Sequence, residues 1–295
     1  MSRVLNRSMQ AGFGLIELMT AMVLGLLVLG AAIAVFQSNQ RTFSANEGQN
    51  RVQEGARVAY EMMSRDIRAA GGSSCSYLAR PDVEHTLTAD ETALITTPVN
   101  GSGTEFTVVS GEDTAYQIVS ATTSTITLKA PPDGQPGWKL SDAFAAGNKV
   151  VICNASQLYV VTISNGGVND ATSTLTFSPA TPVAIYNPGV SPPATVSATR
   201  FRSNRWYLDN GALKVARGGA AGQEVISGVT GLAVTYLRRG ANTYTATPSQ
   251  WDDVSAVRVN LTLRGQKTMG GDVKVDGNNY ITRTTSNVVS IRSRR

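Results

Sequence analysis

A run of 24 residues, from Phe13 to Phe36, carries a single charged side chain, that of Glu17. A membrane crossing takes about 20 apolar residues, and no comparable stretch follows in the 295-residue chain. The sequence therefore predicts one transmembrane helix and only one. The leader before it is polar and basic, with Arg3 and Arg7 and no acidic residue. Positive charge stays in the cytoplasm, which directs the rest of the chain to the outside.

The leader and the apolar run stand in the reverse order to an ordinary secretory signal, which is cut after its apolar region. The junction here reads Gly12-Phe13-Gly14-Leu15-Ile16-Glu17-Leu18. It resembles the type IV prepilin signature, in which a glycine precedes the cut, a phenylalanine follows it, and a glutamate lies four residues further on. The resemblance implies that prepilin peptidase cuts after Gly12 and that Phe13 is N-methylated.

The carboxylate of Glu17 needs a physical explanation. A charge inside a membrane span costs about 2.5–3.5 kcal/mol on insertion scales, and less near the interface. The resemblance implies that the positive N-terminal amine of a neighbouring subunit neutralises it, so that Glu17 serves filament assembly. The alternative is an interfacial carboxylate that only reaches headgroup water.

The helical pattern continues beyond the membrane span. Apolar residues recur three or four apart as one stripe of an amphipathic helix: Phe43, Val52, Ala56, Ala59, Met63, Ile67 and Ala70. Charge pairs at i,i+4 support the other faces: Glu47–Arg51, Arg57–Glu61 and Glu61–Arg65. Gly71-Gly72 predicts the end of the helix. We expect a helix over 13–70, about 87 Å long.

Residues 71–295 are expected to form a β-rich head, because short apolar runs alternate with turn residues there. Asn210-Gly211, between two such runs, predicts a hairpin. The other expected strands are Glu105–Val109, Thr125–Lys129, Lys149–Ile152, Leu158–Ile163, Leu175–Phe177, Leu232–Leu237, Ala256–Leu263, Asp272–Val275 and Val288–Ile291. The expected fold is α+β: a long helix, half transmembrane and half amphipathic, packed on the head. The expected domains are a leader (1–12), a helix (13–70) and a head (71–295), with a sub-boundary near 187–199.

Cys75 and Cys153 are the two cysteines of the chain. An exported chain enters an oxidising compartment, where two cysteines tend to pair. We expect a disulfide that stabilises the head by about 2–4 kcal/mol. Two buried free thiols are the alternative.

Groups that could support catalysis are few. His85 is the one histidine, it lies in no zinc-binding or triad motif, and we expect it in a surface loop. Asp252-Asp253 is expected to be an acidic pair in a loop. The segment Gly270–Gly277 fits a strand and a turn better than a calcium-binding repeat. We expect no enzymatic activity, no cofactor and no metal.

Charge is distributed unevenly along the head. Residues 71–199 carry a net charge of −6, and residues 200–295 carry +9. Opposite charges along one chain suit directional protein–protein docking. The arginines of the last third could also meet DNA phosphates, but a solvated or docking surface is the favoured interpretation.

The resemblance extends into the head. Gly228–Tyr236, Trp251 and Val254–Leu263 look like the C-terminal half of PilW-type minor pilins and of pseudopilin J of type II secretion. Gly147–Cys153 and Asn287–Arg292 fit the PilW type better. The resemblance implies a minor pilin that helps initiate pilus assembly. It would pass from the bacterial inner membrane, with its leader cytoplasmic and its head periplasmic, to the cell-surface pilus.

The implied partners are other minor and major pilins, prepilin peptidase and the inner-membrane assembly machinery. Two other functions remain open. One is a pseudopilin of a type II secretion system, and the other is a membrane-tethered periplasmic binding module.

Overall fold

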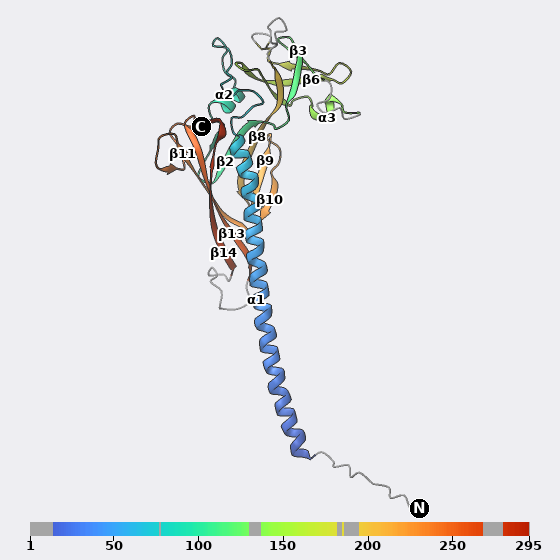
Figure 1. The fold of residues 1–295 in the computed structure, drawn as a ribbon, viewed down its shortest axis with the longest axis vertical. Coiled ribbons are helices and arrows are strands. Elements are labelled where there is room, and N and C mark those ends of the chain that lie inside the picture. Colours follow the sequence, from blue (N-terminus) through green and yellow to red (C-terminus); the bar gives the residue numbers. More distant parts are fainter. Residues whose placement is uncertain are drawn as a thin grey trace, which may run out of the picture. The chain divides into compact units, whose positions relative to one another are not determined.

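The computed structural model describes residues 14–76, 78–129, 137–181, 185, 195–267 and 280–294. The chain divides into two units, Met1–Arg51 with Gly265–Ile281 and Val52–Arg264 with Thr282–Arg295. Helix α1 (Leu15–Ala69) has residues in both units (Figure 1). Its 55 residues confirm the long N-terminal helix that the sequence predicts.

The helix ends where its two glycines predict. Gly71 has φ +67°, a left-handed conformation that a residue with a Cβ adopts at a cost. The Gly72 N–H donates to the Ala69 carbonyl at 2.8 Å, and the Gly71 N–H donates to the Val109 carbonyl at 2.8 Å. The chain therefore leaves the helix directly onto a strand of the head.

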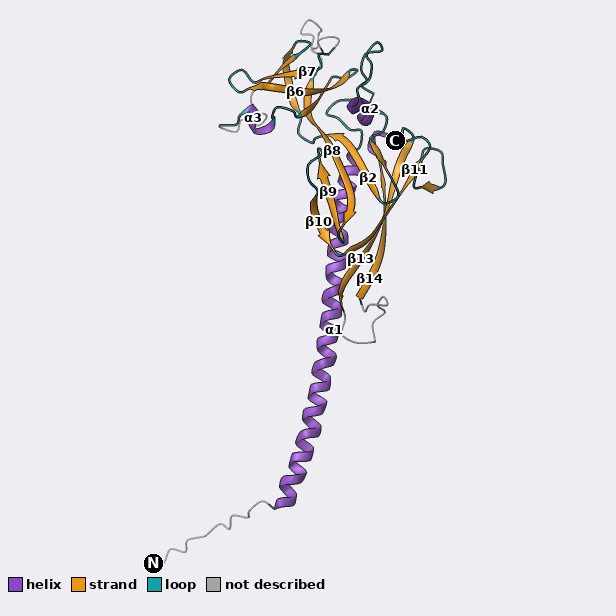
Figure 2. Cartoon of the chain, turned by 180° about the vertical axis from the view of Figure 1, so that it is seen from behind, coloured by secondary structure: helices purple, strands orange, loops and turns teal. Residues whose placement is uncertain are grey.

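Two antiparallel sheets form the lower part of the second unit (Figure 2). In the first, the order is β1 (Val99–Gly101), β2 (Glu105–Gly111), β8 (Ser197–Asp209), β9 (Ala212–Arg217) and β10 (Gln223–Ser227). In the second, it is β12 (Tyr244–Thr245), β11 (Val229–Arg238), β13 (Val254–Lys267) and β14 (Tyr280–Ser290). Asn210 and Gly211 join β8 to β9 with φ of 51° and 74°, which confirms the predicted hairpin.

A small closed barrel forms the upper part of the second unit. Its strands are β3 (Tyr116–Ala121), β4 (Thr125–Leu128), β7 (Thr174–Ser178), β6 (Leu158–Asn169) and β5 (Lys149–Cys153). The start of β8 pairs with β3 on one side and with β5 on the other, so the ring closes. Apolar side chains such as Ile118, Ile126, Val161 and Phe177 fill its interior.

Short helices flank this barrel. α2 (Ala89–Ile95) packs outside β5 and β6 through Leu94, which meets Val151 and Val160. α3 (Leu140–Ala143) contributes Leu140 to the barrel core. A 3₁₀ turn (Arg292–Arg294) closes the described chain.

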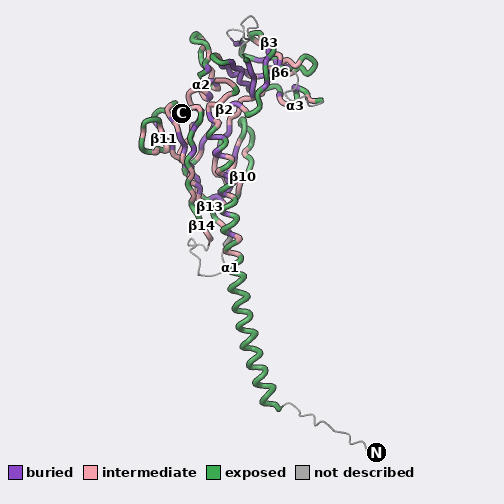
Figure 3. Tube along the Cα trace, viewed as in Figure 1, coloured by how far each residue is buried: buried purple, intermediate pink, exposed green. Residues whose placement is uncertain are grey.

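The amphipathic part of α1 supplies the core between the two lower sheets. Val52, Ala56, Ala59, Met63, Ile67 and Ala70 are buried, which confirms the predicted stripe (Figure 3). They pack with Phe106 and Trp206 of the first sheet and with Tyr236 and Leu261 of the second. Phe43, expected on the same stripe, is 70% exposed.

The charge pairs of α1 differ in part from the sequence-based expectation. Glu47 and Arg51 pair at 2.7 Å as expected. Arg57 pairs with Glu54 at i,i+3 and Arg65 pairs with Asp113 of the head, in place of the two expected pairs through Glu61. Both are exposed, so either geometry is available to the long side chains.

The expected strand Asp272–Val275 and the expected strand and turn of Gly270–Gly277 lie outside the described residues. Of the expected sub-boundary near 187–199, residues 195–199 are described, and 197–199 begin β8.

Candidate functional site

The first half of α1 presents an apolar surface on all sides. Leu15, Leu26 and Phe36 are 81%, 69% and 67% exposed, and every residue between Gly14 and Phe36 is exposed (Figure 3). By length and composition this segment can cross a membrane. Because so much apolar surface is unfavourable in water, the segment requires lipid or other apolar helices around it.

Glu17 lies in the first turn of this apolar helix. Its Oε2 accepts the backbone N–H of Gly14 at 3.3 Å, and the positive end of the helix dipole favours a carboxylate there. The flanking side chains of Ile16 and Leu18 are apolar and exposed. The expected cleavage residues, Gly12 and Phe13, lie outside the described residues.

The second half of α1 is bound to the head by polar contacts as well as by its apolar stripe. The Tyr60 hydroxyl donates to the Thr285 carbonyl of β14 at 2.6 Å and accepts the Leu261 N–H of β13 at 3.2 Å. It therefore bridges two adjacent strands. Burial raises the pKa of Tyr60, so the hydroxyl keeps its proton at neutral pH.

Asp66 makes the second polar attachment. One carboxylate oxygen, Oδ2, accepts the Asn204 Nδ2–H and the Trp206 Nε1–H of β8, each at 2.9 Å. Asp66, Asn204 and Trp206 are all buried. The other oxygen, Oδ1, lies 3.7 Å from Nη2 of Arg202. A buried charge bound in this way fixes the position of the helix against β8.

A disulfide joins Cys75 to Cys153. Cys75 lies shortly after the end of α1, and Cys153 ends β5 of the barrel. The bond therefore attaches the segment that leaves the helix to the barrel wall. The two cysteines are 78 positions apart, so the disulfide restricts the unfolded chain more than a disulfide that closes a short loop would.

Glu91 holds the segment between α1 and β2 in place. Its side chain is 1% exposed, and it accepts from the Thr88 N–H at 2.8 Å and from the Val160 N–H at 3.1 Å. Nε2 of His85 lies 2.9 Å from the same carboxylate, and the His85 ring packs edge-on to Tyr159. His85 is thus in a loop as expected, but its side chain is only 15% exposed because it is part of this cluster.

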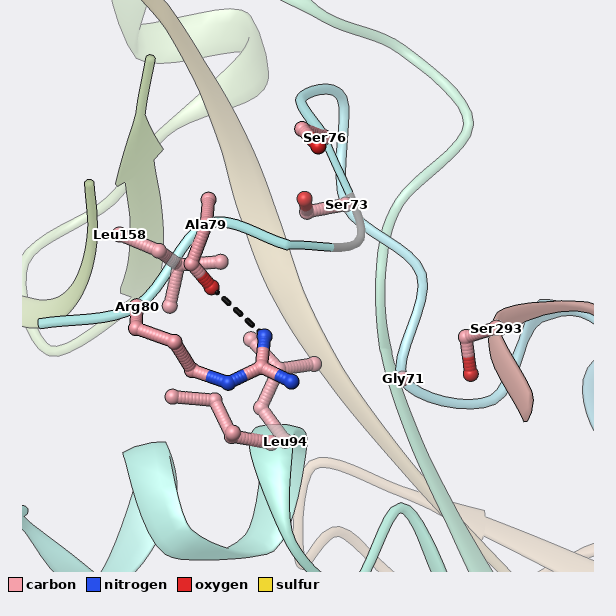
Figure 4. A pocket seen from close by; sticks show the side chains of 9 residues that line it. Gly71, Ser73, Ser76, Ala79, Arg80, Leu94, Leu158 and Ser293 are labelled. Atoms are coloured by element: carbon pink, nitrogen blue, oxygen red, sulfur yellow. Dashed lines mark hydrogen bonds between the residues drawn. The ribbon is translucent and has the colours of Figure 1, made fainter. Parts of the chain in front are cut away.

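A small hollow of about 30 Å³ lies next to the helix end, and Gly71, Arg80, Leu94 and Ser293 form part of its wall (Figure 4). Arg80 Nη1 donates to the Ala79 carbonyl at 2.8 Å within it. Space of this size holds about two water molecules. Within the described part of the chain, no group of three or more His, Cys, Asp or Glu side chains could hold a metal ion.

Sequence reasoning predicted Glu17 and the two cysteines but not Tyr60, Asp66 or Glu91. Asp66 had a recognisable signal. It lies three residues after Met63 and four before Ala70, so it is a charged residue on the apolar stripe. Glu91 had a weaker signal, since Thr88 and Glu91 have the spacing of a capping box, which the structure shows.

Comparisons with known proteins found a family model that matches the N-terminal segment and a solved structure that matches part of the chain. A family model described as the prokaryotic N-terminal methylation motif matches residues 7–33. No curated protein sequence matches the chain. A solved structure, a type IV-like pilin from Thermus thermophilus, is 15% identical over 51% of this chain and 87% of its own, with a TM-score of 0.25. The chain is therefore similar to type IV pilins in its N-terminal methylation motif, which runs into the exposed apolar half of α1.

Proposed function

We propose that this chain is a minor subunit of a type IV pilus, cut between Gly12 and Phe13 and polymerised through its N-terminal helix. The observation that carries the proposal is the coincidence of two features. The methylation motif covers residues 7–33, and α1, which begins at Leu15 within that stretch, exposes its apolar side chains on all faces. A segment that is first a membrane anchor and then a filament core needs both properties.

The mechanism that we propose is polymerisation without catalysis. A contact between two different patches of identical or related subunits does not close, and it repeats as a helical filament. The apolar helices bundle inside and the heads lie outside. Tyr60, Asp66 and the segment held by Cys75–Cys153 keep the second half of α1 on its own head. An incorporated helix therefore carries its head into the filament.

Before assembly, the same helix holds the subunit in the inner membrane, with the leader in the cytoplasm and the head in the periplasm. The partners that follow are prepilin peptidase, the assembly machinery of the inner membrane, and other minor and major pilins. We place this subunit among the PilW-type minor pilins, which help initiate assembly. Residues 1–12, 13–70 and 71–295 are then leader, helix and head.

Processing offers the first test. Gly12→Asp should accumulate with its leader attached, because a bulky charged side chain replaces the small residue before the cut. Gly12→Ala, the matched control, keeps a small residue and should still be processed. Immunoblotting of membrane fractions separates the two forms, since loss of the leader shortens the chain by 12 residues.

Wild-type chain that keeps residues 1–12 in the assembled state would contradict the proposal and favour a membrane-tethered periplasmic binding module. A pseudopilin of a type II secretion system would be processed in the same way. Recovery of the chain in pili sheared from the cell surface distinguishes a pilin from that alternative.

A further inference from the structure

Two open clefts lie next to each other on the second unit. One has a volume of about 610 Å³ and the other of about 740 Å³, both within the range of about 300–1,000 Å³ common for ligand sites. They share one lining residue, Glu112, which follows the end of β2. The first extends to β5, β8 and the end of β9, and the second to the end of α1 and the 3₁₀ turn at the C-terminus.

Basic side chains outnumber acidic ones in these clefts by seven to three among the described lining residues. All three acidic residues already have a basic partner in the same clefts. Asp90 pairs with Lys149 at 2.7 Å, Glu112 accepts from Arg200 Nη2 at 2.8 Å, and Asp113 pairs with Arg65. Arg68, Arg202, Arg217 and Arg292 remain as the surplus.

The four surplus arginines are divided equally, with Arg202 and Arg217 in the first cleft and Arg68 and Arg292 in the second. Within the described ranges, the Arg217 side chain donates to the neutral side chain of Gln223 at 2.7 Å and forms no ion pair. Arg68 and Arg292 are exposed and form no ion pair with any residue that the structure describes.

Arg202 is the least satisfied of the four. Its Nε and Nη2 are buried and have no hydrogen-bond acceptor within the described ranges. The Oδ1 atom of Asp66 lies 3.7 Å from Nη2 of Arg202, which is too far for a hydrogen bond. The charge of Arg202 is therefore only partly offset by its neighbours, and it adds to the positive potential of the first cleft.

We propose that the two clefts together bind an extended segment of a partner protein that carries at least two carboxylate side chains, one for each arginine pair. Arginine suits this role, because its planar fork binds a carboxylate through two parallel hydrogen bonds. The inference goes beyond the proposed function and does not depend on it, since it concerns only the head.

The linings favour an acidic protein segment over a nucleic acid. Three carboxylates are interspersed among the cations, and they would repel a continuous phosphate backbone. Single-stranded nucleic acid also uses aromatic side chains as stacking platforms. The described linings contain one aromatic residue, Phe201, and Lys149 Nζ lies 5.8 Å from its ring centre. Alternating charges of both signs are typical of specific protein–protein contacts.

The test uses the full-length chain in detergent micelles and a synthetic eight-residue peptide of alternating Glu and Ser with blocked ends. Binding is measured by fluorescence anisotropy of the labelled peptide. We expect saturable binding that weakens with added salt, and no binding of the matched Gln-Ser peptide. Arg68→Gln/Arg217→Gln should weaken binding about tenfold or more.

The control is Arg41→Gln/Arg283→Gln, which removes the same charge from exposed positions outside both clefts. It should bind the Glu peptide as the wild type does. The proposal is wrong if the Glu and Gln peptides bind alike, if neither binds, or if the control weakens binding as much as the cleft variant. It is also wrong if a single-stranded oligonucleotide of eight nucleotides binds more tightly than the Glu peptide and responds to the cleft variant, which would indicate a nucleic-acid site.

Discussion

Glu17→Ala is expected to insert into the membrane and to lose its leader normally, yet to be largely missing from filaments. In a subunit processed as proposed, the new terminal amine would be only four residues from Glu17 in sequence, so the two charges could partly neutralise each other. Insertion alone therefore does not require a neighbour. Assembly does, because bundled helices exclude water and make an unpaired charge costlier.

The environment of the helix strengthens this expectation. Lipid tails are as apolar as leucine, so moving the exposed surface of α1 from lipid into a helix bundle yields no hydrophobic gain. Close packing of the helices, and the pairing of Glu17 with the terminal amine of a neighbouring subunit, must then make the filament more favourable than lipid for the helix. Glu17→Asp keeps the charge on a shorter side chain and should restore part of the incorporation.

The measurement compares the amount of each variant in membrane fractions with its amount in sheared filaments. We expect equal membrane levels and a large loss of Glu17→Ala from the filaments. Equal incorporation at equal membrane abundance would mean that Glu17 is only an interfacial carboxylate.

Asp66→Ala is expected to destabilise the head by about 3–5 kcal/mol, the cost of removing one partner from a buried charged contact. The substitution leaves the Asn204 and Trp206 donors, both buried, without their acceptor. It also removes the nearest negative charge from Arg202. Because these contacts join α1 to β8, the lost stability should come from a weaker attachment of the helix to the head.

Asp113→Ala serves as the matched control. Asp113 also pairs with an arginine, Arg65, but both of these side chains are exposed to solvent. It should leave the stability unchanged within error. Urea unfolding of the full-length chain in micelles, followed by tryptophan fluorescence, reports the difference. If the two variants unfold at the same urea concentration, the Asp66 contact does not hold the helix.

The long helix was predictable because two local signals agree along it. Apolar residues recur at the helical period, and the chain contains no proline between Phe13 and Ala70 to interrupt it. The hairpin at Asn210-Gly211 was predictable for a similar reason, since both residues tolerate positive φ. Each of these features is decided within a few neighbouring residues.

The closed barrel was not predictable from the sequence. Its closure depends on β8, whose first residues pair with both β3 and β5, so that Ala198 lies opposite Tyr116 on one side and Ile152 on the other. These partners are about 45 to 80 positions away in the sequence, and alternation of apolar residues does not identify which strands pair. The expected strand list also lacked β3, without which the ring cannot close.

The polar attachments show the same limit. Asp66 was visible as a charged residue on an apolar stripe, but its partners Asn204 and Trp206 are 138 and 140 positions away. Arg65 likewise pairs with Asp113 of the head, where local spacing favoured Glu61. A tertiary partner replaced a local one because α1 packs on the head at that point.

The central claim is that the N-terminus is processed, and intact-mass and peptide mass spectrometry of the mature chain tests it most directly. The chain should begin at Phe13, have 12 fewer residues than the printed sequence, and carry one added methyl group on its terminal amine. A mature chain that begins at Met1, or that is cut after the apolar segment ending near Phe36, would contradict the claim.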